Sequence, residues 1–157
     1  MLLGLLDDKD KAILELLLQD SRASTKSISE RLSIPRVTVH DRIKRLQDKG
    51  IIEKFTLKLS HEKLGMPLHG FILANCVGDR AKSDRRSVAK EISKLPFIVG
   101  CHIITGQWDF IIEVVAKEMD SLGDSILDDL SKIEGIGQTQ TMITFYSFPG
   151  AAFGYVE

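Results

Sequence analysis

The 157-residue sequence carries 21 Lys and Arg against 22 Asp and Glu, a formal net charge of −1. This balance excludes a protein that a strong overall positive field draws to nucleic acid. No apolar run approaches the roughly 20 residues that span a bilayer, and no basic segment precedes the first leucines as in a signal peptide. We therefore expect a cytoplasmic protein without a membrane segment.

The charge is divided unevenly along the chain. Residues 1–60 hold 12 Lys and Arg against 9 Asp and Glu, whereas residues 61–157 hold 9 against 13. A weakly basic first part and an acidic remainder are typical of a chain with two tasks. So little positive charge predicts weak DNA binding by one copy, and hence a dimer or a larger assembly.

Residues 24–50 predict a helix–turn–helix. Ser24 or Thr25 offers an N-cap for a short helix, Pro35 interrupts the helical pattern, and a second helix ends before Gly50. In the second helix, an apolar stripe at Val39, Ile43 and Leu46 is expected to pack on the rest of the domain.

The face opposite that stripe carries the candidate DNA-binding residues. The start of a second helix reads base edges in the major groove, while neighbouring cations hold phosphates. The alternative is a solvated charged helix in a helical hairpin; the turn spacing and a strand-like run at 51–59, which would form a wing, favour the DNA-binding module. Val37, Asp41 and Lys44 point directly away from the stripe, with Thr38, His40 and Arg45 beside them. The other candidates are Arg36 and Arg42, nearer the packed edge, and Thr25 at the start of the first helix.

A helix capped by Asp7 or Asp8 precedes this motif and completes a three-helix core. The predicted first domain is thus a winged helix-turn-helix over 1–59. Gly65 and Pro67 mark a linker at 60–67. The remaining residues, 68–157, form the second domain.

The second domain shows a different order of elements. Periodicity predicts strands and helices at 68–77 (strand), 84–95 (helix), 97–105 (strand), 108–116 (strand), 121–133 (helix) and 137–147 (strand). This β-α-β-β-α-β order is that of the ferredoxin-like fold, a four-stranded antiparallel sheet with both helices on one face. The fold class of the chain is therefore α+β.

Two strands are apolar on both faces. In the strand at 108–116, Ile111 and Val115 lie on one face, and Phe110, Ile112 and Val114 lie on the other. In the strand at 137–147, Ile143 and Phe145 lie on one face, and Met142, Tyr146 and Phe148 lie on the other. Because an uncovered antiparallel face is normally polar, we expect a second copy to cover it in a dimer with twofold symmetry.

Four passages in this order carry a resemblance to a known family: LDDKDKAILELLLQDSR, RIKRLQDKGIIEKF, IITGQWDFIIEV and IEGIGQTQTMI. The chain resembles the leucine-responsive/asparagine-regulator (Lrp/AsnC) family of bacterial and archaeal transcription factors. The resemblance implies an N-terminal DNA-binding module and a C-terminal dimerising domain that assembles further, to a tetramer or an octamer. It departs from the family at Pro35, where a capping serine is usual.

The resemblance also implies an amino-acid effector bound between dimers. Its contacts, carried over by motif, are Gly106, Trp108, Asp109, Thr139 and Thr141. An aspartate suits the ammonium of a free amino acid, and hydroxyl groups suit its carboxylate. The alternative is that the glycine and tryptophan only shape a hairpin and that the threonines are ordinary strand residues.

The sequence shows no nucleophile–base pair, phosphate loop or metal-ligand spacing, so we expect no enzyme activity, cofactor or metal. The leading hypothesis is a regulator that binds double-stranded DNA and is tuned by an amino acid. The alternative is an architectural protein that wraps DNA without sensing a ligand.

Overall fold

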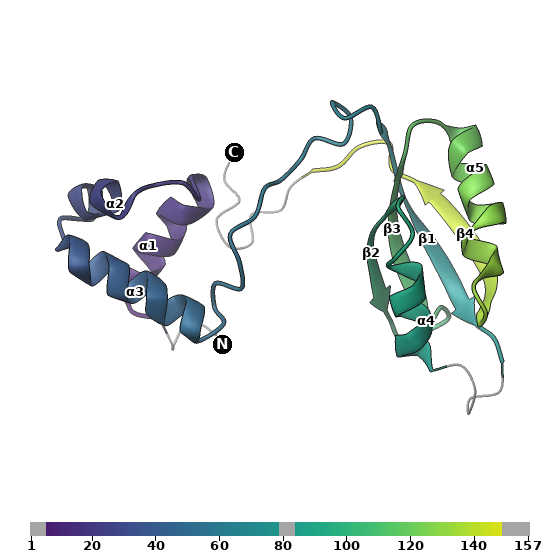
Figure 1. Cartoon of the computed structure of the whole chain (residues 1–157), viewed down its shortest axis with the longest axis horizontal. Helices are drawn as coiled ribbons and strands as arrows, with labels where there is room; N and C mark the ends of the chain where they lie inside the picture. Colours follow the sequence, from purple (N-terminus) through teal and green to yellow (C-terminus); the bar gives the residue numbers. More distant parts are fainter. Residues whose placement is uncertain (1–5, 79–83, 149–157) are drawn as a thin grey trace. The chain divides into compact units, whose positions relative to one another are not determined.

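The computed structural model describes residues 6–78 and 84–148 (Figure 1). The chain divides into two compact units, with the boundary between Lys58 and Leu59. The first unit contains α1 (Asp8–Gln19), α2 (Thr25–Leu32) and α3 (Arg36–Asp48). The second contains β1 (Leu68–Cys76), α4 (Arg85–Ile92), β2 (Ile98–Ile103), β3 (Phe110–Ala116), α5 (Met119–Asp128), the short 3-10 helix η2 (Leu130–Lys132) and β4 (Ile136–Ile143).

Side-chain caps begin the first two helices, as predicted. Asp7 and Asp10 form a capping box at α1, in which Asp7 Oδ1 accepts the Asp10 N–H at 2.8 Å. At α2, Ser24 Oγ accepts the Ser27 N–H at 3.1 Å. Pro35 precedes α3 without a side-chain cap. The helix forms nevertheless, because the fixed backbone angle of proline suits the start of a helix.

A small apolar core holds the three helices together. Its buried side chains come from every helix and from the turn between α2 and α3: Ile13, Leu17, Ile28, Ile34 and Val39. Leu46, two turns beyond Val39 on α3, is 1% exposed. The predicted packed stripe of α3 is therefore confirmed.

Ion pairs join α1 to α3 beside this core. Arg42 Nη1 donates to Asp7 Oδ2 at 2.6 Å and to Asp10 Oδ1 at 2.7 Å. Arg45 Nη2 donates to Asp10 Oδ2 at 2.7 Å. Asp10 is only 2% exposed, so its carboxylate has lost water and needs these cationic partners. We call these two aspartates and two arginines the α1–α3 charge cluster; their formal charges cancel.

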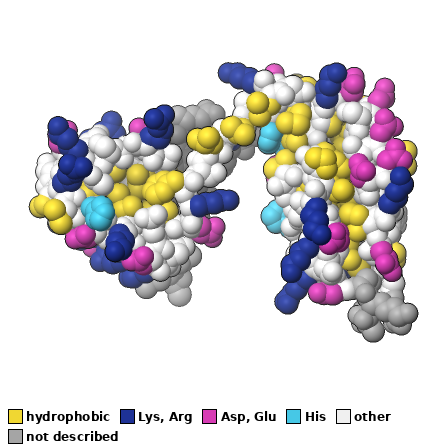
Figure 2. All heavy atoms as spheres, in the orientation of Figure 1, with side chains coloured by type: hydrophobic (Ala, Val, Ile, Leu, Met, Phe, Trp, Pro, Cys, Tyr) yellow, Lys and Arg dark blue, Asp and Glu magenta, His cyan; other side chains and the backbone are white. Residues whose placement is uncertain are grey.

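The predicted wing strand at 51–59 is wrong for the single chain. The N–H groups of Ile51 and Ile52 donate back to the Leu46 carbonyl, and no strand follows before β1. A strand needs a neighbour for its backbone groups, and residues 53–59 make no backbone hydrogen bond to another described segment. Its apolar side chains stay exposed along the extended stretch (Figure 2), with Phe55 at 48% and Leu57 at 76%.

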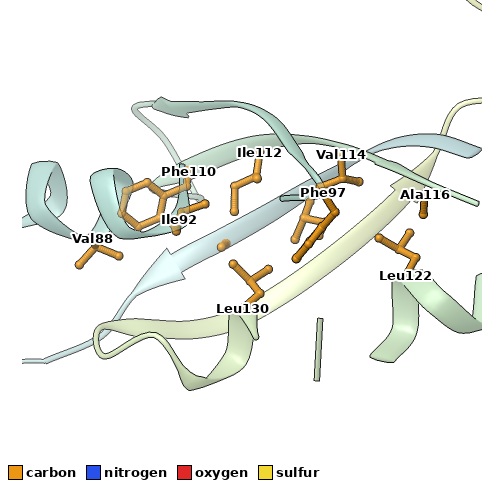
Figure 3. Close-up of a cluster of buried hydrophobic side chains, with 11 residues drawn as sticks. Val88, Ile92, Phe97, Phe110, Ile112, Val114, Ala116, Leu122 and Leu130 are labelled. Atoms are coloured by element: carbon orange, nitrogen blue, oxygen red, sulfur yellow. The ribbon is translucent and has the colours of Figure 1, made fainter. Parts of the chain in front are cut away.

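The second unit confirms the predicted β-α-β-β-α-β order. Its strands form one antiparallel sheet in the order β2-β3-β1-β4. Helices α4 and α5 pack on the same face, where both contribute to one buried core (Figure 3). The core side chains are Ile72, Ala74, Val88, Ile92, Phe97, Phe110, Ile112, Val114, Ala116, Leu122 and Leu130.

Most elements of the second unit end earlier than predicted, α4 at Ile92 and β2 at Ile103 among them, and the largest differences are in β4 and α5. β4 stops at Ile143 rather than 147, close to where its pairing partner β1 begins at Leu68. The last pair is Gly70 with Ile143, and one more bond runs from the Thr144 N–H to the His69 carbonyl. Phe145 therefore lies beyond the strand, 89% exposed. The helix expected over 121–133 ends at Asp128 and tightens into η2.

The charge cluster predicts how the first unit responds to acid. The hydrogen bond from Arg42, together with that from the Asp10 N–H, lowers the pKa of Asp7 from 3.8 to about 2. The stabilisation from this carboxylate is complete above pH 3.8 and is lost as the pH falls through about 2. Asp7→Asn, which still caps α1, should flatten the fall in stability over this range when denaturant midpoints are measured against pH. Asp8→Asn, which loses only an exposed contact to Lys11, is the matched control. Parallel pH curves for Asp7→Asn and the wild type would contradict the prediction.

Candidate DNA-binding face and effector site

The outward face of α3 carries the residues that its periodicity predicts. Val37 is 71% exposed, and Asp41 and Lys44 are exposed one and two turns further on. Thr38 is half-buried beside them. His40 is exposed, with its Nδ1 3.3 Å from a carboxylate oxygen of Asp41. These side chains lie on the part of a second helix that reaches base edges in a helix–turn–helix.

Two further candidates lie together at the start of α2 and α3. Arg36 Nε donates to Thr25 Oγ1 at 3.1 Å, which joins the first turns of the two helices. Both helix starts present free backbone N–H groups, which suit a phosphate. The structure thus brings Thr25 and Arg36 into one group beside the outward face.

Arg42 and Arg45 lie differently, because both point back to α1. The Arg42 side chain is 18% exposed and that of Arg45 is 45% exposed. The hydrogen bonds to Asp7 and then to Asp10 raise the pKa of Arg42. Sequence reasoning missed Asp10, although a signal was present: it falls on the same helical face as the buried Ile13 and Leu17, where an acid needs a partner.

The hairpin between β2 and β3 holds the first three candidate effector residues. Gly106 is exposed, and its φ of 122° is a backbone conformation that favours glycine. Trp108 is half-buried. Asp109 Oδ2 accepts the Cys76 N–H at 2.8 Å, and Asp109 Oδ1 lies 2.7 Å from Arg85 Nη2.

Arg85 is a residue that the sequence analysis did not identify. It stands in the first turn of α4, 24 positions before Asp109, so no local spacing links the two. The link comes from topology, because α4 begins after the end of β1 that lies beside the start of β3. The half-exposed guanidinium of Arg85 keeps donors beyond the one it gives to Asp109.

The two threonines lie on the other side of β1. Thr139 and Thr141 of β4 pair with Ala74 and Ile72, whereas Asp109 lies at the start of β3, on the opposite edge of β1. A single chain therefore does not bring the two halves of the predicted site together.

The sheet face without helices carries an apolar patch with one ion pair. Strand register places Phe71, Leu73, Ile111 and Met142 there, on three neighbouring strands. His69 Nε2 lies 2.8 Å from Glu113 Oε1 on the same face. The register confirms that Ile111, Val115 and Met142 share this second apolar face, although Val115 is already buried, at 4% exposed. Tyr146 and Phe148 lie beyond β4. We call the face that carries Phe71, Leu73, Ile111, Met142 and the His69–Glu113 pair the open sheet face.

Neither a metal centre nor a membrane span emerges from the described residues. No group of three His, Cys, Asp or Glu side chains in 6–78 and 84–148 is arranged to hold a metal ion. None of the helices in these ranges is long and apolar enough to cross a bilayer.

The comparisons with known proteins agree with this division. A family model described as winged helix-turn-helix DNA-binding matches residues 6–53, and one described as Lrp/AsnC ligand binding domain matches residues 71–148. An uncharacterised HTH-type transcriptional regulator of Pyrococcus furiosus is 40% identical over 141 residues, which cover 90% of this chain and 93% of that protein. The HTH-type transcriptional regulator FL11 of the same organism is 37% identical over 141 residues, 89% of each protein.

Solved structures show the same architecture. A transcriptional regulator of Neisseria meningitidis in complex with L-Met has a TM-score of 0.84 at 25% identity, over 94% of each chain. LrpC of B. subtilis has a TM-score of 0.80 at 27% identity, over 92% of this chain and 97% of that one. With matching models over both units and relatives at 40% identity, this chain belongs to the Lrp/AsnC family of DNA-binding transcription regulators.

Proposed function

We propose that this regulator binds double-stranded DNA as a homodimer or higher oligomer, and that an amino acid tunes its assembly or its DNA affinity. The observation that carries the effector proposal is the Asp109–Arg85 ion pair, which stands at the end of the sheet in the unit matched by a ligand-binding model. The L-Met bound to the structurally similar N. meningitidis regulator supports an amino acid as the ligand class.

DNA recognition is assigned to the outward face of α3. Val37, Thr38, His40, Asp41 and Lys44 would face base edges, since they lie on the exposed side and early turns of the helix. Thr25 and Arg36 would hold a neighbouring phosphate. This unit carries little net positive charge, so two copies on one duplex would be needed for firm binding.

The second copy is assigned to the open sheet face. Phe71, Leu73 and Ile111 leave apolar area on a face that no described helix covers. A symmetric sheet-on-sheet contact would bury this area and enclose the His69–Glu113 pair with its hydrogen bond intact. The unpaired stretch around Leu57 fits the same assembly, because its backbone and apolar side chains also lack a partner in the described chain.

The Asp109–Arg85 pair suits a zwitterion. Asp109 is already neutralised by Arg85, so a bare amine would have to compete with the guanidinium. An amino acid brings both charges: its ammonium can face Asp109 while its carboxylate takes the remaining donors of Arg85. Asn75 adds an unpaired acceptor in the same region, because its side-chain oxygen is buried without a hydrogen-bond partner among the described residues. Thr139 and Thr141 would join the site from a second chain, since β1 separates them from Asp109 within one chain.

The assembly predicts a specific effect of charge on the open sheet face. Leu73→Glu should reduce the sedimenting mass of the oligomer, because an unpaired carboxylate in an apolar contact loses its hydration. Leu127→Glu is the matched control, since Leu127 lies on α5 with 69% of its surface exposed. Thermal melting of both variants checks that each is folded. A folded Leu73→Glu variant with the wild-type mass would refute the proposed contact.

The effector proposal is tested by calorimetry with a panel of amino acids, and with the amide of whichever binds. Arg85→Gln should weaken binding of the amino acid about 10- to 100-fold, the cost of about 1.5–3 kcal/mol for losing a charged hydrogen bond. It should also abolish the preference for the amino acid over its amide. Arg86→Gln is the control, because Arg86 is exposed and its side chain pairs with no described residue. Equal affinity in Arg85→Gln and the wild type would refute the role of Arg85. A wild type that binds no amino acid at millimolar concentration would favour the architectural alternative.

A further inference from the structure

The α1–α3 charge cluster gives two of the arginines on the DNA-reading helix an unexpected environment. Arg42 and Arg45 stand three residues apart on α3, so both project toward α1. Asp10 Oδ1 accepts from Arg42 Nη1 at 2.7 Å and from Arg45 Nη2 at 2.8 Å. Asp10 Oδ2 accepts from Arg45 Nη2 at 2.7 Å and from the Asp7 N–H at 3.3 Å. Every oxygen of this buried carboxylate is therefore occupied.

Burial makes these contacts hard to exchange. Asp10 is 2% exposed while both arginines cover it, so an arginine that leaves breaks short charge-assisted hydrogen bonds to this carboxylate. If Arg42 or Arg45 turned to a DNA phosphate, the carboxylate would keep its charge with fewer partners, which is strongly unfavourable. Asp7 adds a second carboxylate against Arg42, with both oxygens within 2.7 Å of Nη1. A phosphate approaching these arginines would also meet two negative groups.

Lys44 offers the contrast. It lies between the two arginines in sequence but on the exposed face, and it forms no ion pair within the part of the chain that the structure describes. Asp41 and Asp48 lie about one turn away on the same face without pairing with its ammonium group, whereas both guanidinium groups of the cluster are held by carboxylates. The cations of α3 thus divide into those that face α1 and those that face solvent.

We propose that Asp10 is a positioning residue: it holds Arg42 and Arg45 against α1, withholds both guanidinium groups from DNA phosphates, and fixes the orientation of the α3 face that reads DNA. The role goes beyond DNA binding itself. With Arg42 and Arg45 held by Asp10, fewer cations contribute sequence-independent affinity for phosphates. Base contacts then contribute a larger fraction of the total binding free energy.

The test compares Asp10→Asn with the wild type on two duplexes, one selected from a randomised pool by the wild-type protein and one scrambled. The amide has nearly the same size but leaves the arginines without their buried anion. Affinity for the scrambled duplex should rise, and the plot of log K against log salt should steepen by about 0.9 for each arginine that gains a phosphate. The ratio of selected to scrambled affinity should fall about tenfold, within the range of one base contact.

A purely structural role for Asp10 would lower the melting temperature without changing the salt slope. A folded Asp10→Asn variant with the wild-type slope would therefore overturn the proposal. If Asp10→Asn does not fold, Arg42→Gln and Arg36→Gln decide the question, because Arg36 is the α3 cation assigned to a phosphate. Arg36→Gln should reduce the slope by about 0.9 per bound subunit, and Arg42→Gln should leave it unchanged. Equal reductions in both variants would overturn the proposal.

Discussion

The pairing of β1 on both edges is the constraint on which the second unit depends. Ile72 of β1 lies opposite Ile112 of β3 and Thr141 of β4, so β1 is central and the helices that follow it in sequence must cross the sheet. Both helices pack on one face and bury a single core there. The other face keeps Phe71, Leu73 and their neighbours, which no helix among the described residues covers. An apolar antiparallel face of this kind favours contact with a second copy.

Each functional part of one chain is incomplete by itself. Strand β1 separates Asp109 from the threonines of β4. The stretch around Leu57 is exposed and has no neighbouring strand among the described residues. The DNA-binding unit has little free positive charge, because Asp7 and Asp10 at the start of α1 pair with Arg42 and Arg45 of α3. A second copy would bring threonines to Asp109, a neighbour to the stretch around Leu57, and a second set of cations to the DNA. For this reason we expect DNA binding and ligand binding to depend on assembly.

Local pattern predicted most of the fold, and long-range pairing limited the rest. Caps such as Asp7 and Ser24 and the apolar periodicity of each helix depend on neighbours within four residues, so these predictions are confirmed. The strand at 51–59 was wrong because a strand also needs a partner, which no pattern within it can supply. In the candidate sites, helical geometry predicted the exposed face of α3. The two ion pairs were not predicted, because Asp10 lies 32 positions from its partner Arg42, and Arg85 lies 24 positions from its partner Asp109. Such contacts follow from packing rather than from spacing.

We propose that ligand binding, assembly and DNA binding form one linked equilibrium. An effector shifts DNA affinity only as far as its own affinity differs between the states involved. The most direct measurement titrates the amino acid found by calorimetry while light scattering follows the mass and fluorescence anisotropy follows DNA affinity. We expect both signals to change with the same midpoint, and Arg85→Gln to move the two midpoints together to higher ligand concentration. A DNA affinity that responds to the ligand while the mass stays constant, or a mass that responds while DNA affinity does not, would contradict the claim.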